Sequence, residues 1–125
     1  MLTIHPDLPR HVVAYTLDGT ATAPDVRALT RAVEAATVRG HVHLMGEIGG
    51  LGGLTLDALR TVVRDGFGLI ARVGRVDRYA VVTDTGWIAA AAKAQGALLP
   101  GVEVRTWPRA ERPAALAWAS EALSS

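Results

Sequence analysis

The sequence predicts an α/β fold: a mixed, mostly parallel sheet of about five strands with an N-terminal hairpin and four helices, in a single domain over residues 1–125. Half of the 125 residues are hydrophobic and 20% are charged, a composition typical of a globular protein with a packed core. Short runs of β-branched and aliphatic residues alternate with segments whose apolar residues recur at helical spacing. This alternation favours parallel strands joined by right-handed crossover helices.

The chain opens with two apolar runs that predict a β-hairpin. Residues 2–4 and 11–17 are rich in β-branched and aromatic side chains, which favour strands. Between them stands His5-Pro-Asp-Leu-Pro9, and its two prolines favour a turn. We therefore expect the two strands to pair antiparallel.

Four segments carry apolar residues at the spacing of an amphipathic helix. They cover residues 25–38, 56–70 and 87–98, and the segment that begins at Pro108. Gly40 follows the first helix as a stop signal, and Pro108 suits the first turn of the last one. The four helices are expected to cover a central sheet.

Three further runs, 41–48, 78–83 and 102–107, read as the remaining strands. The run 78–83 is short, apolar and β-branched, which suits a strand buried on both faces of a parallel sheet. Ligands of open α/β sheets bind at the carboxyl ends of the parallel strands. We therefore expect any site at that edge, where Asp18, Glu47 and Asp84 provide the polar groups.

Composition excludes several classes of partner and chemistry. Thirteen basic residues against 12 acidic ones leave a net charge of +1, so we expect no nucleic-acid partner. No uninterrupted apolar run approaches the roughly 20 residues that span a bilayer, and we expect a cytoplasmic protein that is not membrane-embedded. Without cysteine, disulfides, thiolate metal sites and cysteine nucleophiles are excluded.

One short motif raises the hypothesis of a phosphate-ester hydrolase. Leu17-Asp-Gly-Thr20 follows an apolar strand, as in the catalytic loop of haloacid-dehalogenase phosphatases. Their reaction uses an aspartate nucleophile two residues before Asp18, where this chain has Thr16 with no activating base evident. We rank this hypothesis third and predict that the protein is not an enzyme.

Two other signals also fall short of a site. The glycine-rich segment 49–53 lacks the Lys-Ser/Thr of a P-loop and the spacing of a dinucleotide fingerprint. His41, His43 and Glu47 alternate along one strand and share a face, but His41 and Glu47 would lie about 20 Å apart at strand rise. We therefore predict no metal and no cofactor.

Several loose motifs occur in an order that resembles one known family. They are the start Met1-Leu-Thr-Ile-His-Pro-Asp-Leu-Pro9, the helix entry Asp18-Gly-Thr-Ala-Thr-Ala-Pro-Asp25, Ala80-Val-Val-Thr-Asp-Thr-Gly-Trp87, Glu103-Val-Arg-Thr-Trp107 and Ala114-Ala-Leu-Ala-Trp118. In this order they resemble the SpoIIAA-like family of small bacterial proteins, which is related in fold to STAS and CRAL-TRIO domains. The resemblance implies a STAS-like sandwich and a binding or interaction domain.

The STAS side of the resemblance implies a regulatory protein–protein interaction module. STAS relatives that antagonise anti-sigma factors carry a phosphorylatable serine in Asp-Ser-Ser-Gly-Leu-Gly at the end of the third strand. Glu47-Ile-Gly-Gly-Leu-Gly52 aligns with that motif and lacks both serines. This reading is the alternative hypothesis, a STAS-type partner-binding module without the phosphorylation switch.

The CRAL-TRIO side implies a small apolar or lipid-like ligand at the carboxyl edge, and this is the leading hypothesis. The candidate apolar pocket comprises Leu51, Leu54, Phe67, Trp87, Leu98, Leu99 and Trp107. The simpler alternative is that these residues are ordinary core, since apolar residues at helical spacing need no ligand. A homodimer is a further expectation, although nothing in the sequence fixes its surface.

Overall fold

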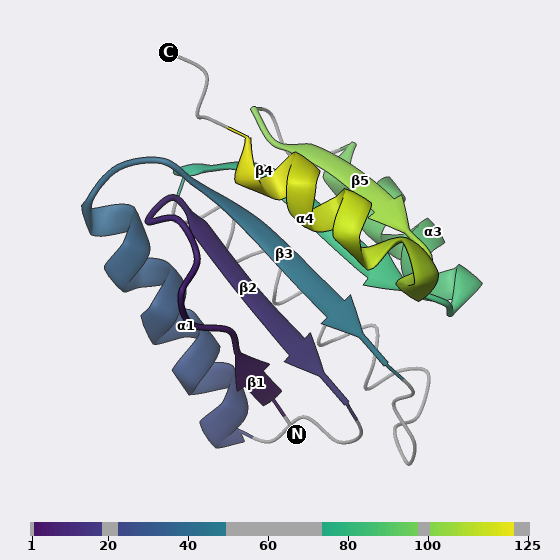
Figure 1. Cartoon of the computed structure of the whole chain (residues 1–125), viewed down its shortest axis with the longest axis horizontal. Helices are drawn as coiled ribbons and strands as arrows, with labels where there is room; N and C mark the ends of the chain where they lie inside the picture. The colour runs from purple at the N-terminus through teal and green to yellow at the C-terminus, as the bar shows by residue number, and fades with distance from the viewer. Residues whose placement is uncertain (1, 19–22, 50–73, 98–100, 122–125) are drawn as a thin grey trace.

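The computed structural model describes residues 2–18, 23–49, 74–97 and 101–121 (Figure 1). Its elements are β1 (Leu2–Ile4), β2 (Val12–Leu17), α1 (Ala23–Val38), β3 (Val42–Ile48), β4 (Val76–Thr83), α3 (Gly86–Gly96), β5 (Glu103–Trp107), the 3-10 turn η1 (Arg109–Glu111) and α4 (Arg112–Ser120). The helix expected over 56–70 lies outside the described residues. The other three predicted helices are present within one or two residues of their expected limits, except at the start of α4.

The five strands form one sheet in the order β1-β2-β3-β4-β5. β1 pairs antiparallel with β2, with Leu2 opposite Leu17, and each later pair is parallel. This confirms the predicted hairpin and the mixed, mostly parallel sheet. The strands lie in sequence order because each crossover moves the chain one strand further in the same direction.

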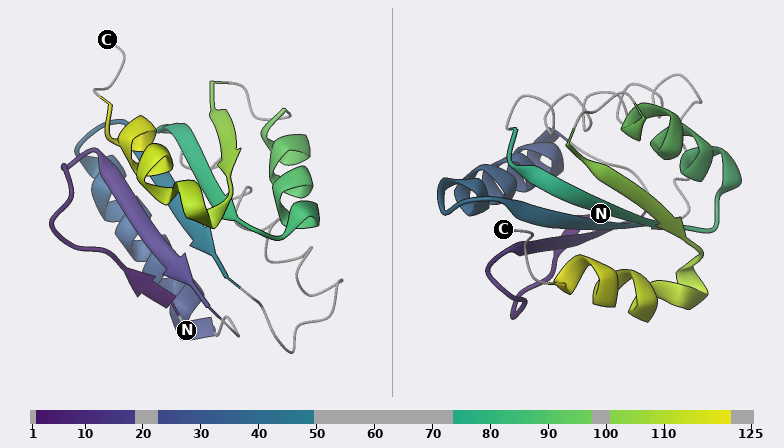
Figure 2. Two further views of the ribbon diagram at one scale, coloured as in Figure 1. Left: turned by 45° about the vertical axis from the view of Figure 1, so that its right-hand side comes forward. Right: turned by 90° about the horizontal axis from the view of Figure 1, so that it is seen from above.

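The helices lie on the two faces of the sheet (Figure 2). Val33 of α1 and Ala92 of α3 belong to one buried cluster on one face. Ala115 and Ala119 of α4 belong to a second cluster on the opposite face. Right-handed crossovers that all advance in one direction leave their helices on the same face, whereas α4 follows the last strand and is free to cover the other.

The α4 face of the sheet is closely packed. Ala115 and Ala119 have no exposed surface, and such small side chains allow the helix backbone to approach the strands. Beneath them, Met45 and Val82 are buried to 1% and 0% exposure. None of the described helices is long and apolar enough to cross a membrane.

The last helix begins later than the sequence predicts. Pro108 is extended, with φ −69° and ψ 158°, and precedes the 3-10 turn η1 rather than an α-helix. α4 starts at Arg112, so that Pro113 lies in its first turn. A helix beginning at Pro108 would place Pro113 in its interior, where proline lacks the required N–H donor, and the chain therefore starts the helix one turn later.

Candidate functional site

The three carboxylates predicted to form the polar edge converge on one arginine. Arg109, in the connection between β5 and α4, donates from Nε to Glu47 Oε2 at 3.0 Å. Its backbone N–H donates to Asp84 Oδ1 at 2.9 Å, and its Nη2 lies 4.0 Å from Asp18 Oδ1. Asp18, Glu47 and Asp84 stand at or just beyond the carboxyl ends of β2, β3 and β4. One residue, through its side chain and its backbone N–H, therefore links the ends of three neighbouring strands.

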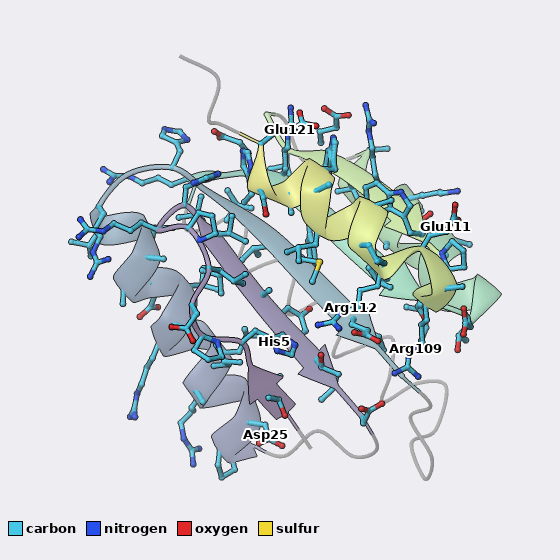
Figure 3. The ribbon with its side chains drawn as sticks, viewed as in Figure 1. His5, Asp25, Arg109, Glu111, Arg112 and Glu121 are labelled. Carbon is cyan, nitrogen blue, oxygen red and sulfur yellow. The ribbon has the colours of Figure 1, made fainter. Side chains whose placement is uncertain are left out.

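A second arginine completes this group, at the end of the sheet where β3 terminates (Figure 3). Arg112 Nε lies 2.9 Å from Glu47 Oε1. The two groups form an ion pair, although their geometry is not that of a hydrogen bond. The Glu47 side chain is only 10% exposed, and each of its oxygens faces one guanidinium. A buried carboxylate is stable only when it is paired in this way. We call Asp18, Glu47, Asp84, Arg109 and Arg112 the carboxyl-edge cluster.

Gly49 allows this cluster to close. Its backbone N–H donates to Leu17 O at 2.9 Å, which extends the pairing of β2 and β3. A Cβ atom at this position would overlap the Asp18 carboxylate and lie 3.3 Å from Arg109 Nη1. The absence of a side chain therefore lets the carboxylate and the guanidinium approach the backbone, a common use of glycine.

The cluster presents charge to solvent. The hydrogen bond to Glu47 is the main cause that raises the pKa of Arg109, and the nearby charges of Asp18 and Asp84 act in the same direction. The side chains of Arg109, Arg112 and Asp18 are 39%, 43% and 58% exposed. The cluster brings three carboxylates and two guanidiniums to this surface, which suits a polar or charged partner.

No group of three or more ligating side chains that could hold a metal occurs among the described residues. His41 Nδ1 lies 2.8 Å from Asp77 Oδ1, while His43 Nδ1 donates to Ala119 O at 2.9 Å. The two histidines that the sequence places on one strand thus contact different partners, one a carboxylate and the other a helix carbonyl.

Thr16 has a neighbour that the sequence did not reveal. His5 Nε2 lies 2.6 Å from Thr16 Oγ1. The hairpin brings them together, because the His5 backbone N–H binds Ala14 O and Thr16 lies two residues further along β2 on the same face. An imidazole therefore stands beside Thr16, but the aspartate nucleophile of the phosphatase motif is still missing.

The candidate apolar pocket lies mostly outside the described residues. Leu51, Leu54, Phe67, Leu98 and Leu99 fall there, and of Trp87 only the backbone, in α3, is described. Trp107 packs against Trp118 at a ring-centroid distance of 5.4 Å, beside the buried cluster under α4. Ala92 of α3 packs on the opposite face. The described part of the structure does not test this pocket, which stays a prediction.

A second polar cluster lies at the other end of α4. His43 Nδ1 donates to Ala119 O, His11 Nε2 donates to Glu121 O at 2.8 Å, and Arg78 Nη1 donates to Trp118 O at 3.0 Å. Cationic and N–H groups at a helix C-terminus satisfy its unpaired carbonyls. Burial is the main cause that lowers the pKa of His43, and the nearby Arg78 lowers it further. This cluster holds α4 on the sheet.

Arg109 and Arg112 are the site residues that sequence reasoning missed. Arginines are scattered along the chain without a local run, so neither stood out. The available signal was position: both follow the last parallel strand and so reach the same edge as the three carboxylates.

Comparisons with known proteins identify a family from the sequence and a matching fold from a solved structure. The model of the SpoIIAA-like family matches residues 12–120. A crystal structure of an uncharacterised protein of the DUF3478 family from Shewanella loihica PV-4, described as having a SpoIIAA-like fold, superposes with a TM-score of 0.68 at 21% identity, over 94% of this chain and 93% of that one. No curated protein matches the chain significantly. At this identity the structural likeness establishes the fold alone.

Proposed function

We propose that this chain, which belongs to the SpoIIAA-like family, is a non-catalytic binding domain whose contact surface is the carboxyl edge of its sheet. The observation that carries the proposal is the carboxyl-edge cluster. Arg109 brings carboxylates from three strand ends together at one surface, although these carboxylates are far apart in the sequence. Carboxyl edges of parallel sheets are the usual place for binding.

The occupant that this surface fits best is a protein partner, as in a STAS-type interaction module. The cluster is polar and partly exposed, with Asp18 58% exposed, and it holds three carboxylates beside two guanidiniums. A basic group on the partner would complement Asp18 and Asp84 and would guide its approach. Without the two serines of the STAS motif, binding here is not controlled by phosphorylation at that position.

A small apolar or lipid-like ligand is the second candidate, favoured by a pair of tyrosines on the α1 face. The hydroxyls of Tyr15 and Tyr79 hydrogen-bond to each other in an otherwise apolar region, above Gly46 of β3. Apolar pockets typically contain a few such placed polar groups. Most of the residues expected to line the pocket lie outside the described part of the chain.

Capture from a lysate of the source cell tests the first candidate. The immobilised wild type is compared with Asp18→Lys, and with Glu34→Lys on the exposed side of α1 as a matched charge reversal. We expect a protein that is retained by the wild type and by the α1 variant and is lost from Asp18→Lys. Equal retention by all three would contradict a role for the carboxyl edge.

Native mass spectrometry tests the second candidate on the same preparation. A co-purifying ligand would add a discrete mass that disappears on denaturation, and palmitate added to the protein would raise its melting temperature. An apo mass together with no thermal shift from palmitate would reject the apolar-ligand candidate and leave the protein-partner candidate standing.

A further inference from the structure

β5 is an edge of the sheet. Its strand partner among the described residues is β4 alone, and Figure 2 shows no described strand on its other side. The opposite edge, β1, has three residues, whereas β5 has five. An edge of this length is long enough to pair with another strand.

The side chains of β5 form an ordered pattern along this edge. Arg105 lies opposite Ala80 and Trp107 opposite Val82, so the odd-numbered positions face α4. The side chains of Glu103 and Arg105 are 49% and 55% exposed, and Arg105 Nε lies 2.7 Å from Glu103 Oε2. Two side chains of opposite charge therefore lie on the α4 face of β5, one before and one after Val104 in the sequence.

We propose that β5 pairs with β5 of a second copy of this chain, antiparallel about a two-fold axis at Val104. This register sets Glu103 of each copy opposite Arg105 of the other, since antiparallel partners share a face. The ion pair within each strand is then replaced by two ion pairs between the strands. Such an interface is isologous and closes as a dimer.

Shape supports the same register. An open hollow of about 690 Å³ lies at the start of β5, lined by His41, His43, Asp77, Arg78, Gly101, Val102 and Glu103. In this register Trp107 of one copy reaches the level of Gly101 of the other, in the turn just before β5, where φ is 80°. Trp107, the largest side chain of β5, would thus lie near Gly101, which has no side chain and lines the hollow. Trp107 is half-buried in the single chain and would lose further exposed surface.

The competing explanation is that charge keeps this edge unpaired. Proteins do protect edges with charged residues, usually lysines or inward-pointing charges that any approaching strand must bury. Glu103 and Arg105 instead carry opposite signs, on either side of a residue that can lie on a two-fold axis. Since one short strand buries little area, we expect a weak dimer with a dissociation constant on the order of 10–100 μM.

Sedimentation velocity of the full chain across this concentration range tests the proposal. Glu103→Arg sets arginine against arginine, and Arg105→Glu sets glutamate against glutamate, so each single variant should remain monomeric. The double variant Glu103→Arg/Arg105→Glu restores both pairs and should dimerise as the wild type does. Glu34→Arg on α1 is the charge control and should leave dimerisation unchanged.

A mixture of the two single variants gives an independent measurement. One copy then carries two arginines and the other two glutamates at the facing positions, so they should form a heterodimer although neither self-associates. A wild type that is monomeric throughout the range, or dimers that the single variants do not weaken, would overturn the proposal. So would a double variant that stays monomeric while circular dichroism shows it folded. None of these outcomes depends on the partner proposed for the carboxyl edge.

Discussion

Glu47→Gln is the most direct perturbation of the carboxyl-edge cluster, because it removes the buried charge and keeps the shape. Two contacts are affected, at 3.0 Å to Arg109 and 2.9 Å to Arg112. The contact to Arg109 is a charge-assisted hydrogen bond, which contributes about 1.5–3 kcal/mol when shielded from water, whereas the contact to Arg112 is an ion pair without hydrogen-bond geometry. The two arginines are 39% and 43% exposed, so solvent screening brings each contact towards the value of about 1 kcal/mol or less that surface pairs have.

The expected cost of Glu47→Gln is therefore about 1–2 kcal/mol, since glutamine keeps one acceptor for Arg109 and avoids burying a charge. For a chain of this size that corresponds to a melting temperature lower by about 3–8 °C. Urea unfolding and calorimetry measure both quantities. The control is Glu34→Gln, on an exposed position of α1, which should stay within about 0.5 kcal/mol of the wild type.

A double-mutant cycle with Arg112→Gln separates the ion pair from other effects of the substitution. We expect a coupling free energy of at least about 0.5 kcal/mol that shrinks as salt is added. A Glu47→Gln variant as stable as the wild type, or a cycle with zero coupling, would refute the reasoning that Glu47 anchors the two arginines.

Three further predictions concern buried groups. Gly46→Ala should cost about 1–3 kcal/mol by equilibrium unfolding, because its Cβ would lie 2.5 Å from the Tyr15 ring, whereas Gly86→Ala, with open space around it, should be nearly neutral. Burial raises the pKa of both tyrosines, Tyr15 and Tyr79, so tyrosinate absorbance at alkaline pH should appear only as the protein unfolds; a normal titration in the folded state would contradict this. Because the pKa of His43 is lowered in the folded state, its contribution to stability is complete above about pH 6.5 and is lost as the pH falls below that value; unfolding free energies at pH 7.5 and 5 should differ less in His43→Gln than in the wild type.

The charged half of the candidate site was only partly predictable. Asp18, Glu47 and Asp84 could be named because each lies at or just beyond the carboxyl end of a predicted parallel strand, and these ends meet at one edge of the sheet. Arg109 and Arg112 could not, because their roles depend on where the last helix begins. That start was expected at Pro108, and Pro113 shifted it to Arg112.

The histidines show a second limit. Alternation along one strand correctly placed His43 and Glu47 on a common face, since side chains in a strand alternate strictly. Their partners lie on α4 and in the connection before it, more than 60 residues away in sequence. Periodicity defines a face but not the element that packs against it, so the role of His43 at the end of α4 was not visible.

The sequence alone determined the fold class, the N-terminal hairpin, the parallel strands and the edge at which the carboxylates gather. Hydrophobic periodicity is a local property of each segment, and crossovers between parallel strands have a fixed handedness. Only the tertiary structure decided that Arg109 joins three strand ends, that His11, His43 and Arg78 hold the end of α4, and that β5 leaves a charged edge. Those contacts join residues distant in the chain, and their existence depends on distances of a few ångströms that no local pattern encodes.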